Sequence, residues 1–231
     1  MKCDTGSTLK LTDVYIWEAP VRLSHWVNAA CLIILSFTGY YIGHPYIDST
    51  SPLFYGTNPH NQFVMGWMRL IHFSTAYVFA MGVLLRIYWG FIGNRYARWS
   101  TMIPYTKERL NELYHDLRFY LLLDPRPPFV LGHSILAGMA YVVLFLGYLV
   151  SILTGFALMS QSHVGLFWKV VGGWILPYFP VQEIRLIHHF IMWFLIVFPI
   201  VHMYIGWTTD LVEDNCVMSS IFSGHKTCRE E

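Results

Sequence analysis

The chain has 231 residues, of which 55% are hydrophobic and only 13% are charged, and its formal net charge at pH 7 is +1. A soluble globular domain carries about 25% charged residues, so the composition favours lipid as the main solvent. A net charge this close to zero gives no reason to expect a nucleic-acid partner.

Residues 1–20 contain several charged side chains and lack the apolar stretch of a cleavable signal peptide, which is therefore not expected. Four later segments are apolar over the roughly 20 residues that a membrane-crossing helix needs. They are residues 21–43, 64–91, 134–159 and 184–207. The predicted fold is all-α, an integral membrane four-helix bundle, and residues 1–231 form a single domain.

The distribution of Lys and Arg predicts the orientation, because these residues are enriched in cytoplasmic loops. Most of them lie in the N-terminal segment, in the connection between the second and third spans, and at the C-terminus. Residues 44–68 contain none, and residues 160–183 contain only Lys169. We therefore predict that both termini are cytoplasmic and that the 44–63 and 160–183 loops face a periplasm.

The long inner connection contains a further predicted helix over residues 106–123. Leucines recur there at helical spacing with charged residues between them, a pattern typical of an amphipathic helix at the membrane surface. The polar segment 210–231 is expected to be weakly ordered. No clear repeat is found, since the pairs Thr38-Gly39 and Thr154-Gly155 in the first and third spans are too short to establish one.

Four histidines lie in the predicted spans, where an ionisable side chain is costly and points to function. They are His25, His72, His188 and His202. The last two are fourteen residues apart, which at ~100° and ~1.5 Å per residue puts them on one helix face, ~21 Å apart. One helix could therefore supply a ligand to each of two haems stacked between the helices.

The depth of each histidine in the membrane identifies the second ligand of each haem. His72 and His188 lie near the outer ends of their spans, and His25 and His202 near the inner ends. We predict an outer pair, His72 with His188, and an inner pair, His25 with His202, in which neutral imidazoles are the axial ligands of iron. The alternative is that these histidines form hydrogen bonds between packed helices.

The histidine doublet at 188–189 requires a choice. His189 lies thirteen residues before His202 and is turned ~140° away from it, so we expect it to face lipid headgroups or a neighbouring helix. The chain has no Cys-x-x-Cys-His motif for covalent haem attachment. The two haems are therefore expected to be of b type.

Arginines accompany the chosen histidines. Arg22, Arg69 and Arg185 each precede a histidine by three residues and share its helix face, and Arg86 follows His72 by fourteen. We predict that they bind haem propionates, with ordinary snorkelling at helix ends as the alternative. Gly39, fourteen residues after His25, either makes room for a haem or allows close helix packing.

Several motifs resemble the b-type cytochrome subunit of membrane-bound nickel–iron hydrogenases, and the resemblance covers nearly the whole chain. They are Glu18-Ala-Pro-Val-Arg-Leu-Ser-His25-Trp26, Arg69-Leu-Ile-His72-Phe-Ser, Arg86-Ile-Tyr-Trp-Gly-Phe-Ile-Gly-Asn-Arg95-Tyr and Thr154-Gly-Phe-Ala. The resemblance implies the same four histidine ligands. It also implies a bacterial inner-membrane location and a periplasmic partner, the hydrogenase large subunit together with its iron–sulfur small subunit.

The same resemblance implies a route for electrons from the partner's last cluster to the outer haem, the inner haem and a quinone near the cytoplasmic side. H2 would be split on the partner and not on this chain. The family has Gly-His-Asn before the third span where this chain has Gly132-His133-Ser134. His133 and Ser134 are therefore the expected quinone contacts, with the asparagine replaced.

Two other functions stay open. The chain could serve another periplasmic dehydrogenase, such as one for formate, or it could be a haem-free membrane anchor or transporter whose histidines are structural. The outer segments 164–168 and 174–179 are apolar and aromatic. They are expected to form either a docking surface for the partner or an aromatic belt at the membrane interface.

Overall fold

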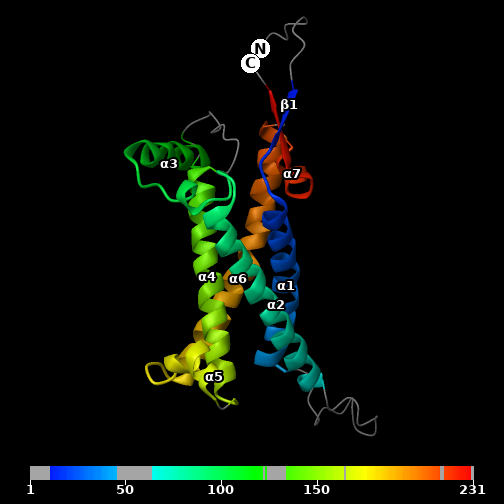
Figure 1. Cartoon of the computed structure of the whole chain (residues 1–231), viewed down its shortest axis with the longest axis vertical. Coiled ribbons are helices and arrows are strands. Elements are labelled where there is room, and N and C mark those ends of the chain that lie inside the picture. The colour runs from blue at the N-terminus through cyan, green and yellow to red at the C-terminus, as the bar shows by residue number, and fades with distance from the viewer. Residues whose placement is uncertain are drawn as a thin grey trace, which may run out of the picture. The chain divides into compact units, whose positions relative to one another are not determined.

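The structure, a computed structural model, describes residues 11–45, 64–121, 123, 134–163, 165–213 and 216–229. Its four long helices are α1 (Ala19–Gly43), α2 (Val64–Ile92), α4 (Ile135–Ser160) and α6 (Val181–Glu213) (Figure 1). All four are long and apolar enough to cross a membrane. They confirm the predicted all-α membrane fold, although α6 continues well past its predicted end at residue 207.

The shorter elements lie between and beyond the long helices. They are β1 (Leu11–Tyr15), η3 (Trp99–Thr101), α3 (Lys107–Tyr120), α5 (Leu166–Val171), η4 (Gly173–Ile175), α7 (Val217–Ser223) and β2 (His225–Arg229). Helix α3 falls inside the predicted surface helix. It begins after Thr106, whose hydroxyl accepts the N–H of Arg109 at 3.3 Å, a typical N-cap.

The described chain forms two compact units, and each long helix contributes to both. Unit 1 comprises residues 1–23, 86–143 and 199–231, and unit 2 comprises residues 24–85 and 144–198. Unit 1 therefore carries β1, α3, α7 and β2, whereas unit 2 carries α5 and η4.

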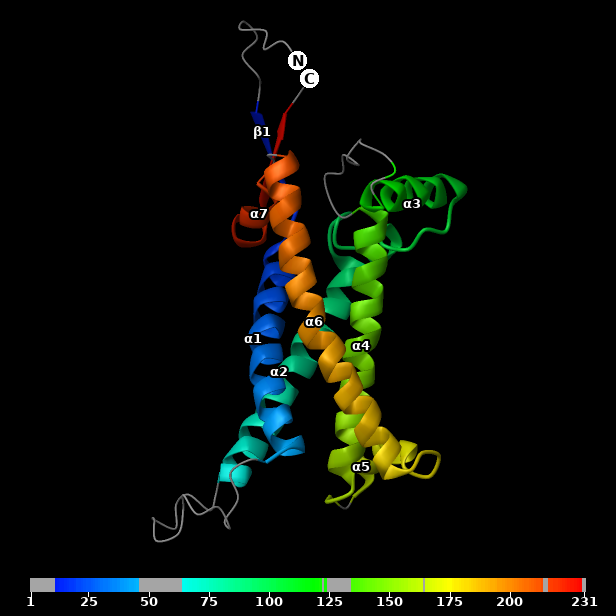
Figure 2. The same cartoon turned by 180° about the vertical axis from the view of Figure 1, so that it is seen from behind.

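In unit 2 the four long helices form a ring in which each helix has two neighbours. The neighbouring helices touch at Asn28–Gly82 (α1 and α2), Phe79–Tyr148 (α2 and α4), Gly147–Phe194 (α4 and α6) and Tyr40–Trp193 (α6 and α1). Helices α2 and α6 are therefore diagonal partners across the ring, and so are α1 and α4. The figures trace these four helices from two opposite sides (Figures 1 and 2).

The exterior of these helices is apolar. Phe37 is 76% exposed, Phe190 72% and Leu186 70%, while Val83 and Ala157 are fully buried. Large contiguous apolar surfaces are rare on soluble monomers, and lipid is the solvent that suits such side chains.

Unit 1 contains a two-stranded sheet that the sequence analysis did not predict. Strand β1 pairs with β2 in antiparallel register, with Leu11 opposite Arg229. Gly224 turns the chain before β2 with a positive φ of 87°, which glycine adopts at little cost, and its carbonyl accepts the N–H of Ile16 at 2.8 Å. The expectation that residues 210–231 are weakly ordered is therefore wrong for α7 and β2.

A carboxylate joins the start of α1 to the end of α2 within unit 1. Glu18 Oε2 accepts the indole N–H of Trp89 and the backbone N–H of Asn94, each at 2.8 Å. The side-chain amide of Asn94 donates in turn to the carbonyl of Ile16 at 2.8 Å. The motif residues that carry the family resemblance at this end therefore have structural roles.

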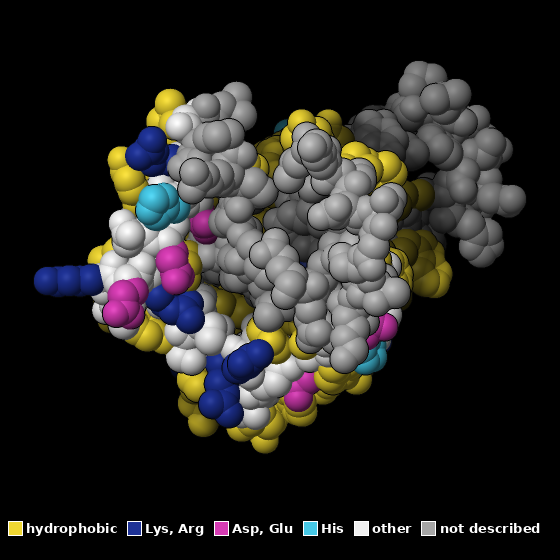
Figure 3. Space-filling view, turned by 90° about the horizontal axis from the view of Figure 1, so that it is seen from above, with side chains coloured by type: hydrophobic (Ala, Val, Ile, Leu, Met, Phe, Trp, Pro, Cys, Tyr) yellow, Lys and Arg dark blue, Asp and Glu magenta, His cyan; other side chains and the backbone are white. Residues whose placement is uncertain are grey.

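Helix α3 is attached to α4 by a second carboxylate. Asp116 is only 3% exposed, and its Oδ2 accepts the N–H of Leu136 in the first turn of α4 at 3.2 Å. A negative charge here satisfies an N–H that has no acceptor within the helix. Seen from above, Lys, Arg, Asp and Glu side chains lie on this face beside hydrophobic side chains (Figure 3).

Candidate functional site

Two of the predicted ligands, His72 of α2 and His188 of α6, lie in unit 2 on the diagonal helices. Each imidazole contacts a threonine of the neighbouring helix. The Nδ1 atom of His72 is 2.9 Å from Oγ1 of Thr38, and the Nδ1 atom of His188 is 2.9 Å from Oγ1 of Thr154. Both threonines are buried.

The hydrogen bonds of Thr38 determine which nitrogen of His72 carries the proton. The Thr38 hydroxyl donates its one hydrogen to the carbonyl of Ile34 at 2.7 Å, so toward His72 it can only accept. This arrangement favours the tautomer of His72 with its proton on Nδ1.

His188 is held in the same way from α4. Thr154 donates to the carbonyl of Val150 at 2.7 Å, and its lone pairs face Nδ1 of His188 at 2.9 Å. With Nδ1 protonated, the lone pair of each imidazole is on Nε2. This tautomer is the one that a metal ligand requires when its other nitrogen donates to a second group.

A glycine follows each threonine and leaves room for the imidazole of the neighbouring histidine. A Cβ atom on Gly39 would lie 3.1 Å from Cε1 of His72, and one on Gly155 would lie 3.3 Å from Cε1 of His188. Both distances are tighter than ordinary contacts between carbon atoms. The space that Gly39 provides is thus occupied by the imidazole of His72.

These paired contacts belong to an internal repeat that the sequence analysis did not detect. Residues 69–72 and 185–188 are both Arg-Leu-Ile-His, and each residue of one copy lies 116 positions before its equivalent in the other. Thr38-Gly39 and Thr154-Gly155 have the same offset. The expectation that no clear repeat exists is therefore wrong: the α1–α2 hairpin recurs as α4 with α6.

Ring contacts between the helices follow the same offset. Tyr40 of α1 contacts Trp193 of α6 with ring centroids 6.2 Å apart. The equivalent residues, Phe156 of α4 and Tyr77 of α2, contact each other at 5.8 Å. A twofold relation thus exchanges α1 with α4 and α2 with α6, so His72 and His188 occupy equivalent positions in unit 2.

The neighbour of His188 is excluded from this arrangement. The ring of His189 makes an angle of 86° with that of His188, and Nδ1 of His189 hydrogen-bonds the carbonyl of Arg185 within α6 at 2.8 Å. His189 faces α1, as expected for a residue directed at a neighbouring helix.

The other two predicted ligands belong to different units. His25 lies in unit 2, where its ring is 5.0 Å from that of Trp26, and His202 lies in unit 1 on α6. Under the repeat, His25 is equivalent to Tyr141 and His202 to Arg86. The inner pair therefore stays a prediction from helical spacing.

Arg86 is a buried cation within unit 1. It is 3% exposed, its Nη2 donates to the carbonyl of Ala97 at 3.2 Å, and its guanidinium lies over the rings of Trp99 and Tyr141. No carboxylate forms an ion pair with it in the part of the chain that the structure describes. A buried charge inside a membrane span is retained for a partner or a function.

The remaining arginines are more accessible. Arg69 and Arg185 are exposed and occupy equivalent positions in the repeat, and Nη1 of Arg185 donates to Oε1 of Gln182 on its own helix at 3.4 Å. The Nη1 atom of Arg22 donates to the carbonyl of Phe222, which connects α1 to α7.

The predicted quinone contacts are only partly described. His133 lies outside the described residues. Ser134 is the N-cap of α4, since its Oγ accepts the N–H of Ala137 at 3.2 Å and its carbonyl accepts that of Gly138 at 2.8 Å. This capping role accounts for the serine by itself.

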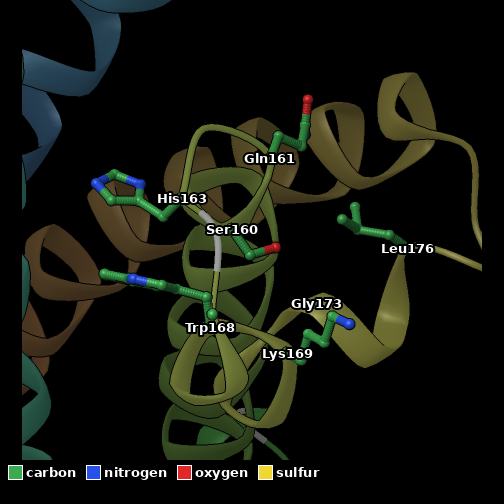
Figure 4. A pocket seen from close by; sticks show the side chains of 8 residues that line it. Ser160, Gln161, His163, Trp168, Lys169, Gly173 and Leu176 are labelled. Atoms are coloured by element: carbon green, nitrogen blue, oxygen red, sulfur yellow. The ribbon is translucent and has the colours of Figure 1, made fainter.

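A pocket of about 330 Å³ lies where α4 meets α5 in unit 2, and none of the predicted haem ligands lines it. Its walls are Ser160, Gln161, His163, Gly165, Trp168, Lys169, Gly173 and Leu176 (Figure 4). On one side the rings of His163 and Trp168 have centroids 4.5 Å apart and planes tilted by 36°. Next to the pocket, Leu166, Phe167 and Tyr178 are exposed. Their exposure is consistent both with a docking surface and with an aromatic belt at the membrane interface.

Comparison with known proteins places these features in a family context. Residues 16–224 match the family model described as prokaryotic cytochrome b561. The chain is 38% identical over 230 residues to a protein of Cupriavidus necator, covering 98% of this chain and 91% of that protein. It is 36% identical over 226 residues to one of Azotobacter vinelandii, covering 96% and 92%.

Both of these relatives are named "Probable Ni/Fe-hydrogenase B-type cytochrome subunit". A protein of Escherichia coli K12, named "Probable Ni/Fe-hydrogenase 1 B-type cytochrome subunit", is 34% identical over 224 residues, covering 92% of this chain and 90% of its own length.

Proposed function

Since this chain belongs to the prokaryotic cytochrome b561 family, we propose that it is the diheme membrane subunit that carries electrons from a periplasmic nickel–iron hydrogenase to the quinone pool and anchors that complex. The family and the four apolar helices make it a multi-pass b-type cytochrome of the bacterial inner membrane. Haem b supplies one-electron redox chemistry when bound.

The observation that carries the proposal is the equivalence of His72 and His188. Each imidazole contacts a buried threonine, which favours the tautomer that leaves Nε2 as the basic nitrogen. The two histidines belong to helices that lie diagonally across the four-helix arrangement of unit 2. Two neutral imidazoles with Nδ1–H donated to a fixed acceptor are the donor set that bis-histidine haem requires. The residues present therefore fit the outer haem.

For the inner haem we propose His25 and His202, on the strength of their spacing from the outer pair. His202 is fourteen residues from His188 on α6, so both lie on one face of that helix. Arg86 is a cation that lacks an ion-pair partner among the described residues, and a propionate would supply the missing anion. Arg22 keeps a buried Nε donor for the same purpose.

For the outer haem, Arg69 and Arg185 are the proposed propionate contacts. Each lies one helical turn from its histidine, both are exposed, and the repeat makes them equivalent. The distribution of Lys and Arg supports cytoplasmic termini, which would place His72 and His188 toward the periplasmic partner. The hydrogenase small and large subunits are the partners that the relatives' names suggest.

Electrons would then move from the periplasmic side toward the cytoplasm, where His133 and Ser134 stay the proposed quinone contacts. Moving one electron against a negative interior costs about 2.3 kcal/mol per 100 mV, which the potential difference between H2 and quinone must supply. Taking the protons for quinol from the cytoplasm would add to the gradient.

A reduced-minus-oxidised absorption spectrum, with haem counted per polypeptide, tests the haem assignment. We expect two b-type haems in the wild-type chain and one in each of the His72→Ala and His202→Ala variants. His163→Ala, which changes an exposed histidine outside the proposed sites, is the matched control and should retain both haems. A colourless protein in membranes not exposed to detergent would establish the haem-free anchor instead.

A second experiment separates the possible electron donors. Membranes containing the chain and its co-purifying partner are given H2 or formate, and the rate at which the haem absorption of the reduced state appears is recorded. Reduction of the haems by H2 alone supports the hydrogenase assignment. Reduction by formate alone would mean that the chain accepts electrons from a formate dehydrogenase instead.

A further inference from the structure

We propose that Thr38 and Thr154 are paired positioning residues, which fix the ring orientation and tautomer of His72 and His188 and thereby set the reduction potential of the outer haem. This inference rests on the proposed function of the two histidines. It assigns a role in electron transfer to two buried threonines that lie inside apolar helices.

The threonines are suited to this role because their own hydrogen atoms are already committed. Thr38 donates to Ile34 and Thr154 to Val150, both at 2.7 Å and both four residues back in the same helix. A hydroxyl whose hydrogen is held in this way offers only lone pairs to a neighbour. It can therefore stabilise only the imidazole form that carries its proton on Nδ1.

An acceptor at Nδ1 also changes the chemistry at Nε2. When Nδ1–H donates to oxygen, the ring gains electron density and becomes a more basic ligand. A more basic ligand favours ferric over ferrous iron, so each threonine should lower the potential of the haem. Because the repeat makes Thr38 and Thr154 equivalent and both contacts are 2.9 Å, their contributions should be equal.

The matched variants are Thr38→Val and Thr154→Val, which keep the branched shape and remove the acceptor, and Thr38→Ser and Thr154→Ser, which keep the hydroxyl. Thr208→Val is the control, because Thr208 of α6 donates to the carbonyls of Tyr204 and Ile205 in the same helical pattern and contacts no proposed ligand in the described structure. The readouts are haem content and the midpoint potential of each haem in the purified full-length chain.

Each valine variant is expected to increase the ferrous-to-ferric ratio of one and the same haem by about three- to tenfold at fixed potential, an upward shift of ~30–60 mV for a one-electron couple. The double variant should show the sum, the other haem should not change, and the serine variants and Thr208→Val should match the wild type. Loss of the outer haem in a valine variant, with retention in the serine variant, also supports the proposal.

Unchanged potentials in haem-loaded valine variants would overturn the proposal, as would equal shifts in the serine and valine variants, loss of haem in both, or a shift for only one of the two threonines. All of these results leave the proposed function intact, because the wild type then contains its haems. A wild type without haem would instead overturn the proposed function.

Discussion

The ring of His189 fills the space that a side chain at Gly43 would occupy: a Cβ atom on Gly43 would lie 2.5 Å from Nε2 of His189. This contact between α6 and α1 shows why two adjacent histidines differ in role. His188 faces Thr154 of α4, whereas His189 is confined against the backbone of α1 with its Nδ1 bonded to Arg185.

The first prediction concerns this doublet. His188→Ala should leave one haem per chain, whereas His189→Ala should leave two, because the second histidine only packs between helices. Pyridine haemochrome spectra of the two purified variants provide the count. Loss of a haem in His189→Ala together with retention in His188→Ala would reverse the assignment of the outer ligand.

The second prediction concerns the glycines beside the ligands. Gly39→Ala and Gly155→Ala should each displace an imidazole by a few tenths of an ångström, since the new Cβ would lie 3.1 or 3.3 Å from the ring. We expect a cost of about 1–3 kcal/mol, typical of overpacking, and a lower occupancy of the outer haem on titration with haemin. Gly66→Ala is the control, because its Cβ would meet nothing within 4 Å.

Gly66→Ala should bind haem normally and even gain about 0.5–1 kcal/mol of helix stability. If all three alanine variants lost haem to the same degree, close packing around the imidazoles would not be the cause.

The third prediction concerns Glu18, which accepts two hydrogen bonds at the junction of α1 and α2. Glu18→Ala leaves the indole of Trp89 and the N–H of Asn94 without this acceptor, so we expect a loss of about 2–4 kcal/mol in the free energy of unfolding. Thermal unfolding in detergent, followed by circular dichroism, measures it. Glu112→Ala removes an exposed glutamate of α3 and should stay within about 0.5 kcal/mol of the wild type.

The fourth prediction concerns the attachment of α3. Asp116→Ala removes the acceptor for the N–H of Leu136, so this amide should exchange with deuterium faster by about one to two orders of magnitude, equivalent to ~1–3 kcal/mol of local stability. Hydrogen exchange detected by mass spectrometry resolves the start of α4. Unaltered exchange there, with a normal rate in the middle of α4, would show that α3 is held by other contacts.

The hydropathy of the chain was sufficient to predict the four spans, because a lipid-facing helix needs a continuous apolar stretch that few other structures contain. The strand pair in unit 1 could not be predicted in this way. Leu11 meets Arg229 only after the whole chain has folded, and neither five-residue segment shows a strong alternation of apolar and polar residues on its own.

The candidate site was predicted in part. Spacing and depth were enough to select His72 and His188, but Thr38 and Thr154 seemed ordinary helix residues whose role depends on a ring from another helix. The repeated Arg-Leu-Ile-His would have identified them, since adding 116 to the numbers of His72 and Thr38 gives His188 and Thr154. The repeat is weak in the sequence because most other equivalent positions differ, as do Arg86 and His202.

The repeat also has a consequence for the assembly of the site. Each hairpin supplies a single imidazole to the outer haem, so neither copy alone could give that iron both of its proposed ligands. As separate chains the two copies would have to meet as a dimer, at a rate set by their concentration. The connection through α3 makes that encounter intramolecular, and a tether of this kind gives an effective concentration in the millimolar range or above. Because both hairpins belong to one polypeptide, they are always present in a one-to-one ratio, even when the membrane holds few copies of the protein.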